Sequence, residues 1–257
     1  MNNKIIELLI KHIFFAIISN GTKISQVNLI KMPINKINLK ILNFAIVIVG
    51  TGFSPNNFNG DMLAEKEIVP LDWKVLNNVS SPIFSQIVYE KGKVNIRVEK
   101  NKITIADNFI TDNKIENSKI AQVAKKLIQK HKHLSYTALG INFETVVPIE
   151  KTENYLKENF INPDKYGVGD NTVGQVSITM MYQLKGGGML NVVLDEGILG
   201  YKFEENAVEY KGILCNANFH RQCQNDSDLP LLISRLNNSN LLEDKQKLAS
   251  VLSGLIK

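Results

Sequence analysis

The feature that most constrains the fold is a run of three short segments with alternating polarity, separated by tight turns. These segments cover residues 83–90, 93–100 and 102–107. In the middle one, Val94, Ile96 and Val98 alternate with charged and amide side chains, which predicts a strand with one buried face and one wet face. Turns this short join only antiparallel strands, because parallel strands need a long crossover connection. The segments therefore predict an antiparallel sheet.

The order of predicted elements repeats along the chain. A strand, a short helix, three strands and a longer helix are predicted at 41–50, 58–67, 83–107 and 118–133, and the same order follows at 136–148, 149–160, 174–223 and 228–256. We expect an α+β fold of mostly antiparallel sheets with helices, containing a duplicated strand–helix–three strands–helix unit. The predicted parts are an N-terminal extension at 1–40, a first half at 41–134 and a second half at 135–257.

Two helices are predicted at the C-terminal end. Asp228 is expected to cap a short segment that ends at Leu236. Asn240 and Glu243 are expected to form a capping box for a helix that ends at Ile256. This last helix has an apolar side, made of Leu241, Leu248, Val251, Leu252 and Leu255. Such a side is able to cover an otherwise unpaired sheet edge.

Residues 1–40 carry the whole net charge of the chain. They contain six lysines and one glutamate, which equals the formal charge of +5, so residues 41–257 balance to zero. The body of the protein is therefore not basic, which argues against nucleic acid as a partner. The uninterrupted apolar run in this part, Ile13 to Ile18, is too short to span a membrane.

Three interpretations of the N-terminal segment stay open. Met32 directly precedes the first well-patterned strand, which favours Met32 as the true start and residues 1–31 as an upstream extension. Alternatively, residues 1–20 form an amphipathic helix that holds the protein on a membrane surface. The third interpretation is a marginal export signal.

Two glycine-rich stretches do not carry the pattern of a nucleotide site. The stretch "IVIVGTGFSP", residues 46–55, has no third glycine, and Ser54 and Pro55 stand where the helix of a dinucleotide fold would begin. The stretch "LKGGGML" lacks the Lys-Ser/Thr of a phosphate-binding loop and lies between two predicted strands, which favours a hairpin turn. No cofactor is predicted.

The strongest enzyme hypothesis is a metal-dependent nuclease that uses Asp195, Glu209 and Lys211. An acidic residue followed on the next strand by acidic-x-Lys can hold a divalent metal and position water. However, acidic-x-Lys recurs elsewhere in the chain. In addition, the apolar positions of the long strand change parity at Gly212, which predicts a bulge and places Glu209 and Lys211 on the solvent side. The nuclease therefore stays the alternative.

A polar row on the same strand is the most unusual predicted surface. Its candidate ligand-binding residues are Asn216, Asn218, His220 and Gln222. Amide side chains in a line can bind a polar ligand, a sugar or the backbone of another strand. The chain contains 30 asparagines, and 27 lysines against 3 arginines, so the AT-rich bias of the coding sequence is a competing explanation for the row.

The two cysteines are predicted to be reduced. Cys215 and Cys223 lie eight steps apart on one predicted strand, a separation of roughly 26 Å that a disulfide cannot bridge. In a regular strand they also do not converge with His220 as zinc ligands. Reduced thiols favour a cytoplasmic protein.

The phrases "NFAIVIVGTGFSP" and "YTALGINF" resemble bacterial proteins carried as hypothetical, over residues 41–145. The order of elements is loosely similar to that of SecB-type chaperone folds, a resemblance that implies no site residues. Together these observations predict a non-catalytic cytoplasmic binding or assembly protein, which associates with itself or with another protein. The nuclease and a peripheral membrane protein held by residues 1–20 are the alternatives.

Overall fold

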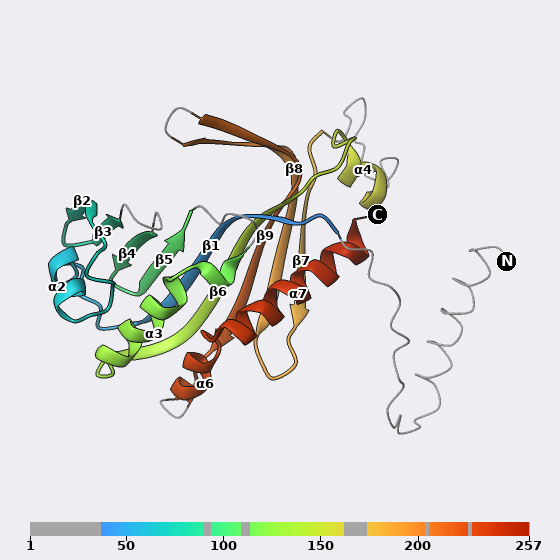
Figure 1. Cartoon of the computed structure of the whole chain (residues 1–257). Coiled ribbons are helices and arrows are strands. Elements are labelled where there is room, and N and C mark those ends of the chain that lie inside the picture. Colours follow the sequence, from blue (N-terminus) through green and yellow to red (C-terminus); the bar gives the residue numbers. More distant parts are fainter. Residues whose placement is uncertain are drawn as a thin grey trace, which may run out of the picture. The chain divides into compact units, whose positions relative to one another are not determined.

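The computed structural model describes residues 37–89, 94–108, 114–161, 174–203, 206–225 and 228–256, with the side chains of 199–208 excepted (Figure 1). All of them belong to the compact unit formed by Lys36–Lys257. The predicted extension, including Met32 and residues 1–20, lies outside the described residues apart from 37–40.

The described strands form one antiparallel sheet of nine strands. The strands are β1 (Lys40–Thr51), β2 (Val75–Ser80), β3 (Phe84–Tyr89), β4 (Val94–Glu99), β5 (Lys102–Asp107), β6 (Ser135–Val147), β7 (Ser177–Gln183), β8 (Met189–Phe203) and β9 (Asn206–Gln222). Their order across the sheet is β2-β3-β4-β5-β1-β6-β9-β8-β7. The predicted α+β class with mostly antiparallel strands is confirmed.

The two halves of the chain follow similar paths through this sheet, although the first half has one strand more, β2, than the predicted unit. In the first half β5 returns to pair with β1, and in the second half β9 returns to pair with β6. The strands β1 and β6 then pair with each other along almost their whole length. The sheet therefore runs without a break across the predicted boundary at residue 134.

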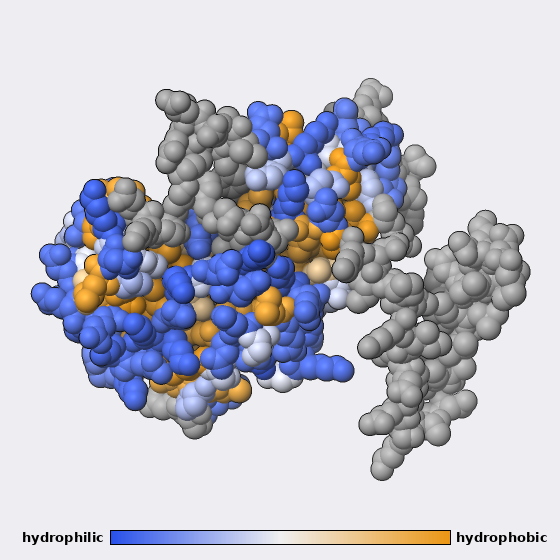
Figure 2. All heavy atoms as spheres, in the orientation of Figure 1, coloured by the Kyte–Doolittle hydropathy of each residue, from blue (hydrophilic) through white to orange (hydrophobic). Residues whose placement is uncertain are grey.

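Three helices cover one face of the sheet: α3 (Ile120–Lys130), α6 (Leu229–Ser234) and α7 (Asn238–Leu255) (Figure 1). The remaining helical segments are η1 (Pro55–Asn57), α2 (Gly60–Glu65), η4 (Ile115–Asn117) and α4 (Tyr155–Phe160). Helix α3 buries Ile120, Val123 and Leu127, which recur at helical spacing and form its core side. Figure 2 shows hydrophilic atoms over much of this side of the molecule, interrupted by apolar patches.

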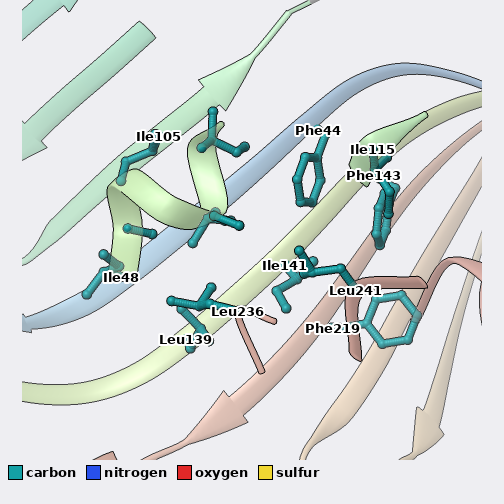
Figure 3. Packing of buried hydrophobic residues seen from close by; sticks show 14 of the residues in the cluster. Phe44, Ile48, Ile105, Ile115, Leu139, Ile141, Phe143, Phe219, Leu236 and Leu241 are labelled. Carbon is teal, nitrogen blue, oxygen red and sulfur yellow. The ribbon is translucent and has the colours of Figure 1, made fainter. Parts of the chain in front are cut away.

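The core is centred on three phenylalanine rings from neighbouring central strands (Figure 3). The Phe44 and Phe143 rings stack with centroids 5.3 Å apart, and Phe219 meets Phe143 edge to face at 5.9 Å. All three side chains are almost completely buried. Because β1, β6 and β9 each contribute one ring, these contacts connect both halves of the chain.

Helix α7 is attached to the sheet by a buried ion pair. Nη2 of Arg221 on β9 lies 2.6 Å from Oδ1 of Asp244 on α7, and the two side chains are 9% and 5% exposed. Burial raises the pKa of Asp244, and the adjacent Arg221 opposes this rise.

The predicted capping box at the start of α7 is wrong. The helix begins at Asn238, so Asn240 lies in its first turn, and its Nδ2 donates to the carbonyl oxygen of Ser234 at 2.7 Å. The amide therefore holds the end of α6. Asp228 does occupy the cap position of α6, but its Oδ2 accepts from the backbone N–H of Gln224 at 2.9 Å rather than from the helix.

Candidate functional site

The face of the sheet opposite α3, α6 and α7 contains a polar trough. It has a volume of about 480 Å³ and is lined by Asn43, Ala45, Asn142, Phe143, Glu144, Asn191, Val193, Asn216, Ala217 and Asn218. These residues come from the four strands β1, β6, β9 and β8. Side chains alternate between the two faces of a strand. Because Phe44 and Ile46 lie on the core face of β1, their neighbours Asn43 and Ala45 lie on the face of the trough.

The register aligns the amides in rows across the trough. On one row Asn142 of β6 lies directly opposite Asn218 of β9, which lies opposite Asn191 of β8. On the next row Glu144 pairs with both Asn43 and Asn216. Directly opposite side chains on one face have Cβ atoms about 4.5–5.5 Å apart, so neighbouring amides in a row are within reach of one ligand.

The amide oxygens of this face are buried without partners. The Oδ1 atoms of Asn43, Asn142, Asn191 and Asn218, and that of Asn95 on β4, have no hydrogen-bond partner among the described residues. A buried acceptor without a donor costs about 1–3 kcal/mol. The oxygens therefore require donors from water or from a ligand.

The charge of the trough limits what it can accept. Glu144 is the one charged side chain among its described lining residues. The carboxylate repels phosphate groups, and the unpartnered amide oxygens can accept hydrogen bonds from N–H or O–H donors. The trough is therefore suited to a neutral or cationic ligand rather than to nucleic acid.

The predicted polar row is divided between two places. Asn216 and Asn218 line the trough, whereas His220 and Gln222 line a separate pocket beside Gly186–Gly188. The pattern of a single strand did not predict Asn43, Asn142 and Asn191 as site residues. Each of them interrupts an apolar strand at a position of the solvent-facing parity, which was a usable signal.

The structure does not bring the predicted nuclease residues together. Asp195 pairs with Leu214, whereas Glu209 pairs with Gly200 and Lys211 with Ile198. Residues directly opposite each other share a face, and the parity of the two strands therefore places Asp195 on the opposite face from Glu209 and Lys211. No group of three or more metal-ligating side chains occurs among the described residues.

The predicted bulge at Gly212 is wrong. Strands β8 and β9 pair residue by residue through this point, with Gly197 directly opposite Gly212. A Cβ at Gly212 would collide with the carbonyl oxygen of Val147, the last residue of β6. The glycine therefore reflects the close approach of a neighbouring strand. Beyond it, β8 and β9 continue past β6 as a two-stranded ribbon (Figure 1).

Neither Cys215 nor Cys223 takes part in a disulfide, as predicted. Cys215 lies on the core side of β9, where burial raises the pKa of its thiol to about 12. A thiol that stays protonated at neutral pH is a poor nucleophile and a poor metal ligand.

Comparison with protein-family models gives no match, and comparison with curated proteins gives none either. The helices of the described residues include none with the length and apolar character needed to cross a membrane.

Proposed function

We propose that this chain is a non-catalytic binding protein, and that it binds a neutral or cationic, donor-rich ligand in the trough. The unpartnered amide oxygens of Asn142, Asn191 and Asn218 carry this proposal. A sugar or an extended peptide backbone would supply the donors that these oxygens lack. The two cysteines form no disulfide, which supports a location in the cytoplasm.

The double variant Asn142→Ala/Asn218→Ala tests this proposal before any ligand is known. If the amides exist for binding, removing two unpartnered buried acceptors leaves the free energy of unfolding unchanged or raises it by about 1–3 kcal/mol. The same variant loses the molecule bound to the wild-type protein. Urea unfolding measures the first effect, and native mass spectrometry of protein taken directly from cells measures the second.

Asn216→Ala serves as the matched control, because Asn216 is exposed on the same strand and face. We expect this variant to keep wild-type stability. If the double variant is instead less stable than this control, the amides stabilise the fold, and the binding proposal fails. Native mass spectra that show bound metal or nucleic acid would favour the nuclease instead.

We also propose that two copies of the chain associate through strand β2. All six residues of β2 are exposed, none is charged, and no described strand pairs with its outer edge. Leu76 and Val79 are 60% and 43% exposed, and Leu71 and Ile83 beside the strand are more exposed still. An uncharged edge with exposed apolar side chains favours pairing with another strand. Two β2 strands can pair about a two-fold axis.

The variant Leu76→Lys/Val79→Lys tests the association. It adds four like charges to a β2–β2 pair, two from each copy, which is unfavourable. We expect the wild-type protein to be a dimer and this variant to be a monomer, as measured by light scattering coupled to size exclusion. The control Met181→Lys, on the opposite edge strand β7, stays a dimer. A monomeric wild type, or a variant that stays dimeric, would contradict the proposal.

A further inference from the structure

A second pocket lies at the end of the β7–β8 hairpin. It has a volume of about 410 Å³ and is formed by the turn Gly186–Gly188, the C-terminal end of β9 and helix α6. This size is in the range of small-molecule sites. Unlike the trough, the pocket is lined by two arginines, Arg221 and Arg235.

Arginine is rare in this chain, so its presence in the pocket indicates a specific role. The chain contains 27 lysines and 3 arginines, and two of the three arginines line this one pocket. Arginine differs from lysine in its planar guanidinium, which donates two parallel hydrogen bonds to a carboxylate or a phosphate. In a chain that otherwise uses lysine for positive charge, two arginines in one pocket indicate recognition of such a group.

Arg221 is buried and retains an unused donor. Its Nη2 donates to Oδ1 of Asp244, whereas its Nη1 and Oδ2 of Asp244 are both buried without a hydrogen-bond partner among the described residues. The residue is 7% exposed. A buried guanidinium nitrogen needs an acceptor, and an anionic ligand in the pocket would supply one.

Arg235 lies on α6 against the hairpin turn. A Cβ added to Gly186 would be 3.6 Å from its Nη2. Gly186, Gly187 and Gly188 have φ values of 84°, 91° and 97°, a region that favours glycine. The turn therefore stays free of side chains beside the guanidinium. Arg235 forms no ion pair within the described part of the chain, although its charge acts to lower the pKa of Asp244.

Two carboxylates balance the two guanidinium groups. Asp244 pairs with Arg221, and Asp228 lines the pocket with its Oδ2 bound to the backbone N–H groups of Gln224 and Asn225. Net charge therefore does not draw the ligand in, and selectivity comes from hydrogen-bond geometry. A ligand that also carries a hydroxyl or ammonium group can donate to Asp228.

We infer that this pocket binds a small molecule through a carboxylate or phosphate group held by Arg221 and Arg235. This inference goes beyond the proposed function, because it concerns a different site and a ligand of opposite charge preference. It does not depend on binding in the trough.

Isothermal titration of the full chain with citrate and with inorganic phosphate, at constant ionic strength, tests the inference. We expect the wild-type protein to bind at least one of the two, and the preferred probe identifies the group as carboxylate or phosphate. Arg235→Ala is expected to weaken binding tenfold or more. Arg235→Lys keeps the charge but loses the planar donor pair, so it is also expected to weaken binding.

Lys132→Ala is the control for loss of a positive charge, since Lys132 is exposed and outside the pocket. It is expected to bind like the wild type, as is Asn142→Ala/Asn218→Ala, which separates this site from the trough. Arg235 is not part of the buried ion pair, so its variants are expected to keep the wild-type circular dichroism spectrum. The inference is overturned if neither probe binds, or if Arg235→Ala and Lys132→Ala bind equally well.

Discussion

Replacing Asp244 by alanine is expected to lower the free energy of unfolding by about 3–5 kcal/mol, because it leaves the buried charge of Arg221 without its partner. Both side chains of this pair are at least nine-tenths buried, and the pair joins α7 to β9. Urea unfolding followed by circular dichroism measures the change. Glu243→Ala, on the adjacent exposed residue, is the control and is expected to change stability by less than about 0.5 kcal/mol.

A second variant separates the charge from the packing. Arg221→Met/Asp244→Leu replaces the pair by apolar side chains, which is often neutral or stabilising at buried sites. We expect it to recover most of the stability that Asp244→Ala loses. A double variant as unstable as Asp244→Ala would show that the specific Arg221–Asp244 geometry, rather than the unpaired charge, determines stability at this position.

Replacing Phe143 by alanine is expected to lower the free energy of unfolding by about 3–5 kcal/mol from lost burial and the resulting cavity. The stacked contact with Phe44 and the edge-to-face contact with Phe219 are also lost, and such pairs contribute about 0.5–1.5 kcal/mol each beyond burial. Because these rings belong to three neighbouring central strands, we expect one unfolding transition that shifts as a whole. Thermal unfolding monitored by calorimetry and by circular dichroism measures it.

The conservative variant Phe143→Leu keeps much of the volume and is expected to cost clearly less than Phe143→Ala. The Phe143→Leu variant is expected to unfold in a single thermal transition. Two separate transitions, of which the alanine variant moves just one, would show that the halves of the chain unfold independently despite sharing a sheet.

The sequence predicted those parts of the fold that depend on local pattern. The alternation through Val94, Ile96 and Val98 and the short turns gave the correct strands, and the apolar spacing in residues 118–133 gave helix α3 within three residues at each end. Strand β2 was missed because all of its residues are exposed. Without a buried face, it has no alternating pattern to detect.

The candidate site was only partly predictable, because it depends on register between distant strands. Asn218 was identified on its own strand, but Asn142 and Asn191 come from strands that only the sheet order places beside it. Glu209 and Lys211 are exposed, as predicted, but they lie on the opposite face of β9 from Asn216 and Asn218, because no bulge occurs at Gly212. Gly212 is explained by the end of β6 at Val147, a contact that a single strand does not reveal.

The central pairing of β1 with β6 has a consequence for synthesis of the chain on the ribosome. Domains tend to form from the N-terminal side as the chain emerges, and β1 can pair with β5 as soon as residue 107 is available. Its other edge stays open until residues 135–147 have emerged, and the far edge of β6 then waits for residues 206–222. Open strand edges invite pairing with other chains. The half-made protein is therefore the form most exposed to aggregation, and the form that a nascent-chain chaperone would most need to protect.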